Sequence, residues 1–271
     1  MAVKNYFDLP LHKVNKDLTY LTSIMPVPDI KAGLPYKFNE YSDVDEPIFD
    51  PQIHLNVEKP EYVTLLPDYR RAKHTCGGDL AYSQPFQFLS KVGVAVMRKI
   101  VLREKPECGP SRGCRIALRG LYYTSPWVRD LHNCPQVLKM ISDIAGEPLV
   151  PTHHINAAPQ VNFSIPGMAG AAEFWHWDSI SYVANFLLND MEEMEGGDLE
   201  IIKMQKHAGM EALVNGTLKP GQVEKLVYGP PGKMVVCQGS EVLHHVTPVR
   251  CANYTFIFRL SKLILDPPSR E

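Results

Sequence analysis

The sequence has little excess charge and no long apolar run. Its 28 lysines and arginines nearly balance 30 aspartates and glutamates, which gives a net charge of -2. A protein that binds nucleic acid or an anionic membrane through charge alone needs a basic surface, and this composition provides none. No apolar stretch approaches the roughly 20 residues of a membrane-spanning helix. We therefore predict a protein without a nucleic-acid or membrane partner.

Cysteines are also few, and residues 1–10 (MAVKNYFDLP) lack the apolar centre of a secretory signal. The six cysteines form no CxxC pair, which excludes zinc-finger spacing. Reduced thiols in a cytoplasmic protein are the simplest interpretation, and a local disulfide between Cys108 and Cys114 is the alternative.

Prolines and glycines number 23 and 18, which are too many interruptions for a bundle of long helices. Residues 1–80 show weak periodicity and are predicted to form an extended, loop-rich arm, followed by a single domain over 81–271. At the start of this domain, apolar residues at helical spacing predict helices within 85–103 and 125–146, with a strand at 115–124 between them. Residues 81–150 are thus the predicted helical support.

From about residue 150 the pattern changes to short segments rich in β-branched and aromatic residues. Turns rich in Gly, Asn, Asp and Pro separate these segments, and successive strands without intervening helices are typical of an antiparallel sandwich or jelly roll. The predicted fold is α+β, with N-terminal helices packed on a β core that spans 150–262. The predicted strands are 160–165, 181–188, 198–204, 233–237 and 254–260.

Two segments of this β-rich half carry metal-ligand chemistry. Residues i and i+2 of a strand point to the same side, so His176 and Asp178 can present an imidazole and a carboxylate to one cavity, while Trp177 faces the other way. A second imidazole, from His244 or His245, completes a three-ligand face. Such a face leaves three positions open on an octahedral metal, which suits Fe(II) that must bind O2 and a second molecule.

These motifs resemble the Fe(II)/2-oxoglutarate-dependent oxygenase superfamily, whose core is a double-stranded β-helix of the jelly-roll, cupin-like type. The resemblance spans roughly residues 159–262 and rests on HWDS, EGGDLE and PGKMVVCQGSEVLHHVTPV. In the superfamily the distal histidine ligand precedes the frame x-Val-x-Pro-Val, which favours His244 over His245. The implied metal ligands are therefore His176, Asp178 and His244.

The resemblance implies an enzyme that uses Fe(II), 2-oxoglutarate and O2. It would oxidise an unactivated carbon of a small organic molecule by hydroxylation, desaturation or cyclisation, as in secondary metabolism. No motif identifies the substrate. Residues 1–80 are expected either to cover the cavity or to mediate a homodimer.

The sequence departs from the superfamily where an arginine usually binds the distal carboxylate of 2-oxoglutarate, because that position is Asn253. Arg119 and Arg250 are the candidate replacements, and Asn162 is a further polar contact. Arg259, Trp177 and Tyr122 are expected to contact the substrate. If nothing replaces the arginine, the chain is instead an iron oxidase that does not use 2-oxoglutarate; a zinc hydrolase and a metal-free binding module are further alternatives.

Overall fold

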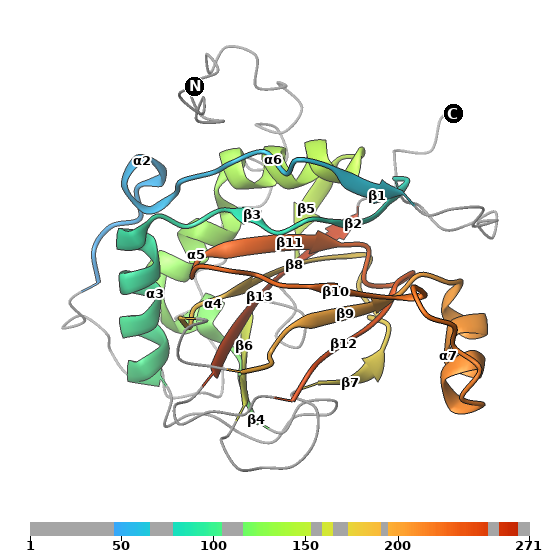
Figure 1. Cartoon of the computed structure of the whole chain (residues 1–271). Coiled ribbons are helices and arrows are strands. Elements are labelled where there is room, and N and C mark those ends of the chain that lie inside the picture. The colour runs from blue at the N-terminus through green and yellow to red at the C-terminus, as the bar shows by residue number, and fades with distance from the viewer. Residues whose placement is uncertain are drawn as a thin grey trace, which may run out of the picture.

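Two antiparallel β-sheets face each other in the part of the chain that the structure describes (Figure 1). The structure is a computed structural model that describes residues 46–65, 78–104, 116–152, 159–164, 173–190, 195–248 and 255–264. Helices lie along the outer side of the larger sheet, and one further helix lies beside the smaller sheet.

The larger sheet follows the path β1-β2-β11-β8-β13-β6-β4, with β3 paired to β11 and β5 paired to β13. Its strands are β1 (Val63–Leu65), β2 (Leu80–Ser83), β3 (Phe86–Gln87), β4 (Ile116–Leu118), β5 (Leu149–Pro151), β6 (Gln160–Ser164), β8 (Tyr182–Leu187), β11 (Lys233–Cys237) and β13 (Thr255–Ile264).

The smaller sheet follows the path β10-β9-β12-β7. Its strands are β7 (Glu173–His176), β9 (Leu199–Ile202), β10 (Val223–Leu226) and β12 (Leu243–Val246). From β6 to β13 the chain passes back and forth between the sheets, with β6, β8, β11 and β13 in the larger sheet and the other four in the smaller one. This winding is the predicted double-stranded β-helix, which is confirmed.

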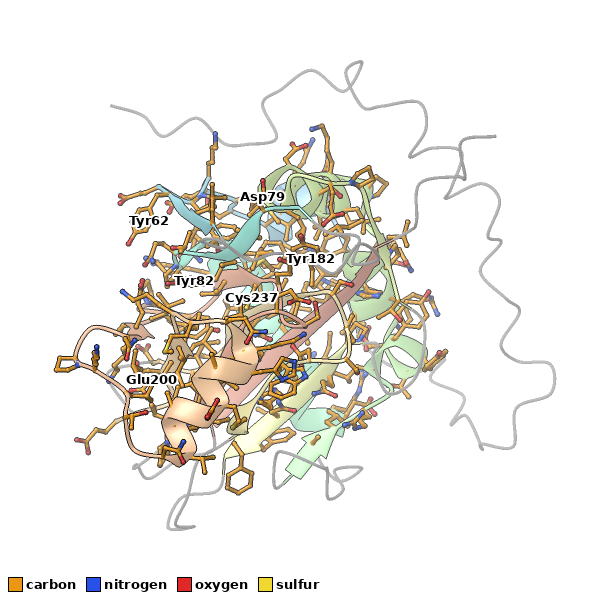
Figure 2. The ribbon with its side chains drawn as sticks, turned by 90° about the vertical axis from the view of Figure 1, so that its right-hand side faces the viewer. Tyr62, Asp79, Tyr82, Tyr182, Glu200 and Cys237 are labelled. Carbon is orange, nitrogen blue, oxygen red and sulfur yellow. The ribbon has the colours of Figure 1, made fainter. Side chains whose placement is uncertain are left out.

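Strand β8 shows how the two hydrophobic layers are separated. Every residue of β8 is buried, because helices cover one face of the larger sheet and the smaller sheet covers the other. Tyr182 packs in the helix-side layer, whereas Val183 packs between the sheets. Tyr82 and Cys237 also belong to the inter-sheet layer, and Figure 2 labels both together with Tyr182. The two layers thus lie on opposite faces of the larger sheet.

The helices are α2 (Pro51–His54), α3 (Lys91–Glu104), α4 (Leu121–Thr124), α5 (Pro126–Asn133), α6 (Pro135–Ala145) and α7 (Lys206–Val214). Apolar faces of α3, α5 and α6 pack on the outer side of the larger sheet in a single layer. Helix α7 contacts β12 of the smaller sheet instead. Among the described residues, none of the helices combines the length and the apolar character that crossing a membrane requires.

The predicted helices differ from the observed ones at their ends, for local reasons. Helix α3 begins only at Lys91, because residues 86–87 pair with β11 as β3. The helix predicted over 125–146 is two helices, because Pro135 starts a new first turn at α6. The strand predicted over 115–124 ends at Leu118, since Gly120 adopts a left-handed conformation with φ of 84° and α4 follows.

All five predicted β-core strands are present, with ends that differ by a few residues. Helix α7 and strand β10 are found between two of them and were not predicted. Within the predicted arm, α2 packs on α3 and β1 pairs with β2 of the larger sheet. Residues 1–45 and 66–77 lie outside the described residues. They make up most of the arm that was predicted either to cover the cavity or to mediate a homodimer.

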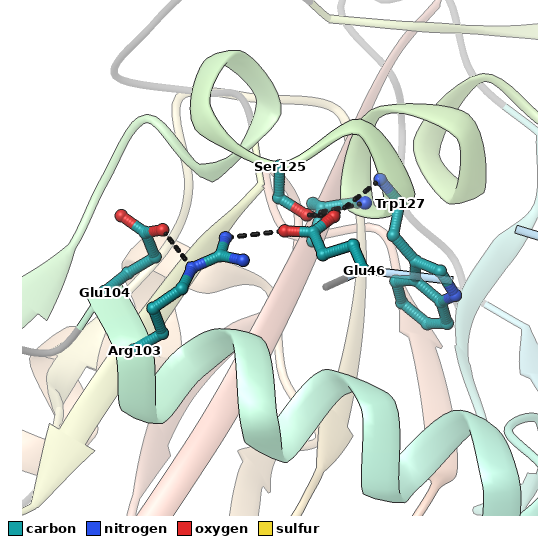
Figure 3. A network of polar contacts seen from close by, with 6 residues as sticks. Glu46, Arg103, Glu104, Ser125 and Trp127 are labelled. Atoms are coloured by element: carbon teal, nitrogen blue, oxygen red, sulfur yellow. Dashed lines mark hydrogen bonds and ion pairs between the residues drawn. The ribbon is translucent and has the colours of Figure 1, made fainter. Parts of the chain in front are cut away.

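A buried polar network joins the first described residue to α3 and α5 (Figure 3). The Glu46 carboxylate accepts hydrogen bonds from the Ser125 hydroxyl at 2.9 Å and from the Trp127 backbone N–H at 3.2 Å, so it satisfies the start of α5. Its other oxygen lies 2.5 Å from Arg103, which also donates to Glu104 at 2.7 Å. The Glu46 side chain is only 7% exposed, which makes this ion pair largely desolvated.

We predict that Glu46→Ala lowers the free energy of unfolding by about 2 kcal/mol, because it removes a helix cap and leaves the Arg103 guanidinium without one buried partner. Urea denaturation followed by circular dichroism measures the change. Ile48→Ala, at a side chain that is 89% exposed, is the control and should change stability by less than about 0.5 kcal/mol. Equal effects of both substitutions would contradict the assignment.

Candidate metal centre

Three candidate ligands converge at the end of the two sheets where β7 leads into β8. His176 is the last residue of β7, Asp178 lies in the turn after it, and His244 on β12 pairs directly with His176. The Nε2 atoms of His176 and His244 lie 3.6 Å and 3.7 Å from the two carboxylate oxygens of Asp178. The three donor atoms all lie within 4.8 Å of one another, so one ion can contact all of them.

Backbone carbonyls fix which nitrogen each imidazole presents to this cluster. The Nδ1 of His176 donates to the Phe174 carbonyl at 2.6 Å, and the Nδ1 of His244 donates to the Val242 carbonyl at 2.8 Å. Because a carbonyl only accepts, Nδ1 carries the hydrogen and Nε2 of the neutral ring carries the lone pair. Two nitrogen lone pairs and a carboxylate therefore face a common point, which is the donor set of a divalent transition-metal site.

The position of Asp178 depends on a glycine in a different segment. The Asp178 backbone N–H donates to the Gly239 carbonyl at 2.7 Å. A Cβ atom on Gly239 would lie 2.2 Å from Oδ2 of Asp178, which no real contact allows. The loop between β11 and β12 therefore needs glycine at 239 to leave room for the carboxylate.

His245, the alternative ligand, lies on the opposite face of the smaller sheet. Its ring stacks on Trp175 at 3.9 Å between ring centroids, and its Nε2 donates to Glu200 at 2.8 Å. Successive residues of a strand point to opposite faces, so the two histidines of β12 cannot both reach Asp178. The structure brings His244 to the cluster and directs His245 to Glu200.

Helix α7 supports the site from outside. The Trp177 ring is T-shaped against His207 at 5.2 Å, and Nζ of Lys206 lies 5.9 Å from the Trp177 ring centroid. Lys206 also donates to the Ser240 carbonyl at 2.7 Å, next to Gly239. Trp177 thus contacts the start of α7 and not the ligand cluster, although it is 37% exposed and borders the site.

The EGGD motif has a structural role in the described part of the chain. Gly196 and Gly197 both have positive φ, and a Cβ on Gly196 would lie 2.0 Å from the Pro248 carbonyl oxygen. Asp198 and Thr247 then exchange two hydrogen bonds, from Asp198 N–H to Thr247 Oγ1 and from Thr247 N–H to the Asp198 carbonyl. The motif fastens the start of β9 to the end of β12, and so helps to hold the strand that carries His244.

Several predicted contact residues lie on β4, β6 and the segment after β4. Asn162 is buried on β6 and accepts a hydrogen bond from Gln160 at 3.1 Å. Arg119 is half-buried directly after β4. Tyr122 is buried at the start of α4, and its hydroxyl accepts from Asn133 at 3.0 Å.

Arg259 lies in the middle of β13, paired with Asn185 of β8 and Gln160 of β6. Arg250 and Asn253 lie outside the described residues. Sequence analysis missed Asn185, which is 8% exposed in a strand whose other residues are all apolar. A lone amide in such a strand was the available signal.

Cys237 lies in the inter-sheet layer two residues before Gly239. Burial raises the pKa of its thiol, so the thiol stays protonated at neutral pH. A thiol is a poor ligand compared with a thiolate, and this leaves the histidines and the aspartate as the donor set of the site.

Solved structures of other proteins are similar to this one. The non-heme alpha-ketoglutarate-dependent carbocyclase SnoK from nogalamycin biosynthesis aligns with a TM-score of 0.53 and 13% identity, over 76% of this chain and 88% of SnoK. AviO1 from Streptomyces viridochromogenes Tue57 aligns with a TM-score of 0.49 and 17% identity, over 70% and 92% of the two chains. At these identities the likeness to SnoK confirms the predicted fold.

Sequence comparison identifies the family. No curated protein matches the chain in sequence. The sequence model of the family HalD, Halogenase D, matches residues 95–261, which include all three candidate ligands. Since this match extends over more than half of the 271 residues, the chain belongs to the Halogenase D family.

Proposed function

We propose that the chain is a non-haem Fe(II)- and 2-oxoglutarate-dependent oxygenase, with His176, Asp178 and His244 as the metal ligands. The convergence of two Nε2 lone pairs and one carboxylate on a common point carries this proposal. The fold supports it, because SnoK, which is described as alpha-ketoglutarate-dependent, shares that fold. Bound Fe(II) would supply the oxidation of the substrate by O2 and the keto acid.

The protein's own contribution is to hold the ligands in place and to keep the reaction away from water. Backbone carbonyls orient both imidazoles, and Gly239 sets the position of the Asp178 carboxylate. His244 is 2% exposed and Asp178 is 8% exposed, so bulk water has little access to this side of the cluster. His176 is the more exposed ligand, and we place the substrate on its side.

The carboxylate of Asp178 favours oxygen transfer over halogenation, in spite of the family's name. An octahedral metal has six positions, and the three protein ligands leave three. With Asp178 as the third protein ligand, a bound keto acid and O2 would take up the remaining positions, and none would be left for a halide. We therefore propose that the reaction is hydroxylation, desaturation or cyclisation of a small organic molecule rather than halogenation.

We propose Arg119 and Arg250 as the candidate residues for the distal carboxylate of 2-oxoglutarate. Arg259, which pairs with Asn185 of β8, stays a candidate for contact with the substrate. The iron oxidase that does not use 2-oxoglutarate is the alternative, and in it no residue would bind that carboxylate.

We also propose that the protein is cytoplasmic. Cys134 and Cys237 are buried free thiols among the described residues. Free thiols are usual in reducing compartments, and disulfides are usual outside them.

The proposed reaction predicts that protein loaded anaerobically with Fe(II) forms succinate from 2-oxoglutarate when O2 and a small organic substrate are added. Asp178→Ala should reduce this rate at least about 100-fold, because it removes a metal ligand. Chromatography measures the succinate that is formed, and an oxygen electrode measures the O2 that is consumed. Mass spectrometry of the product formed in chloride buffer should show either an added oxygen or the loss of two hydrogens, and no chlorine.

Oxygen consumption without succinate would favour the alternative iron oxidase. Chlorinated product from the natural sequence would contradict the assignment of Asp178 as a ligand. Turnover with Zn(II) in place of Fe(II) would contradict the whole redox scheme.

A second prediction concerns Gly239. Gly239→Ala should weaken binding of Co(II) about 10-fold to 100-fold, because the new methyl group displaces the Asp178 carboxylate. Isothermal titration calorimetry measures the affinity. Ser240→Ala is the matched control at the next residue, because only the backbone carbonyl of Ser240 takes part in the contacts described above. Equal affinities for both variants would show that the site tolerates a side chain at 239.

A third prediction separates the two neighbouring histidines. His244→Ala should abolish stoichiometric Co(II) binding, whereas His245→Gln should retain it, because His245 contacts Trp175 and Glu200 on the other face. The same calorimetric titration measures both variants. Loss of metal in His245→Gln with retention in His244→Ala would reverse the assignment.

A further inference from the structure

Strand β7, which carries His176, is the last strand in the path of the smaller sheet and pairs only with β12 among the described strands (Figure 1). It is four residues long, and His176 is its final residue. His244 instead lies on β12, which has β7 on one side and β9 on the other. His176 is therefore the histidine that the hydrogen bonds of the sheet hold less firmly, and other contacts are needed to fix its position.

A β-bulge lies directly before His176. The register of β7 against β12 shifts there by one residue, so that Phe174 and Trp175 together oppose the single residue His245. A bulge bends its strand and changes the direction of the side chains beside it. The Phe174 carbonyl, which is part of the bulge, accepts a hydrogen bond from Nδ1 of His176 at 2.6 Å. The conformation of the bulge therefore sets where Nε2 of His176 points.

Trp175 and His245 contact each other across this bulge, on the face of the sheet away from the metal ligands. Their rings stack with centroids 3.9 Å apart and planes at 23°. The next strand holds the His245 ring in turn, because its Nε2 donates to the Glu200 carboxylate at 2.8 Å. Glu200 pairs with His245 on one side and with Lys225 on the other. A row of four side chains thus crosses all four strands of the smaller sheet, directly behind the histidine ligands.

The centre of this row is largely removed from water. The His245 side chain is 11% exposed and that of Glu200 is 26% exposed, while Trp175 is half-buried. A hydrogen bond to a carboxylate is stronger and more directional in such surroundings than at the surface. Stacked rings add a contact with a defined geometry. Together the two contacts form a stiff link from Glu200 on β9, through His245, to the bulge of β7.

We propose that Trp175 is a positioning residue of the metal centre: by stacking on His245 it fixes the bulge of β7 and so holds Nε2 of His176 at the point where the ligands converge. This inference rests on the proposed function only through its metal site. It gives His245 an indirect role in metal binding, through the strand that it anchors. Without the stack, His244 and Asp178 should stay in place, because β9 and the loop after β11 hold them.

Calorimetric titration of the full-length protein with Co(II), together with the visible absorption of the bound Co(II), tests this role. Trp175→Leu should raise the Kd for Co(II) about 10-fold to 100-fold, which is the usual effect of losing a contact that orients a ligand. The absorption of the bound Co(II) should change as well, because the imidazole of His176 shifts or leaves the metal. Trp175→Phe keeps a ring that can stack on His245, and it should restore most of the affinity.

Two further variants separate this link from a general loss of stability. Glu200→Ala removes the hydrogen bond that holds His245, and it should raise the Kd for Co(II) about 3-fold to 10-fold. This variant decides the question if Trp175→Leu does not fold, as thermal unfolding of the metal-free proteins would show. Val223→Ala, on β10 of the same sheet at a residue that is 36% exposed, is the control and should change neither the Kd nor the absorption.

The outcomes distinguish this inference from the proposed function. If folded Trp175→Leu, or Glu200→Ala in its place, binds Co(II) with the natural Kd and absorption, the inference is overturned, even where the melting temperature falls. Equal losses of affinity in Trp175→Leu and Val223→Ala also overturn it. If Trp175→Leu weakens Co(II) binding as expected but the Fe(II)-loaded natural sequence forms no succinate, the inference stands and the proposed function fails. A natural sequence that does not bind Co(II) would refute both.

Discussion

The site depends on bringing three electron-rich atoms to one point against their mutual repulsion. Two imidazole lone pairs and a carboxylate gain nothing from one another, so the backbone must hold them together until a cation binds. The pairing of β7 with β12 supplies most of this constraint, because it sets His176 directly opposite His244. The carbonyls of Phe174 and Val242 then fix the rotation of each ring. The remainder of the fold keeps these two short strands in register.

The supports of the site come from segments that are distant in sequence. Gly239 and Lys206 act on the turn that contains Asp178, through a backbone hydrogen bond and through a contact with Ser240. The EGGD turn ties β9 to the end of β12. Glu46 plays a comparable role on the helical side, where one carboxylate serves a helix start and an arginine together. Each of these contacts is polar, whereas the helix-side and inter-sheet layers are held together by apolar packing.

Sequence patterns were informative where a single periodicity dominated. The short apolar segments near 160, 182, 199 and 233 are strands because both faces of each are covered, and the motif frame pointed to His244. Local patterns were insufficient where contacts between distant segments determine the secondary structure. Helix α7 is stabilised where Gly209 packs on Ile202 and Leu243. Strand β10 is stabilised by its pairing with β9. Neither contact can be inferred from the residues of α7 or β10 alone.

Asp178 differs from the two histidines in the kind of secondary structure that carries it. His176 and His244 belong to paired strands, whereas Asp178 stands in the turn after β7 and takes no part in the pairing of either sheet. A change at position 178 can therefore alter what the metal binds while the scaffold stays intact. If Asp178 ligates the metal as proposed, substitutions in this turn change the donor set without disturbing the strands that hold the two histidines.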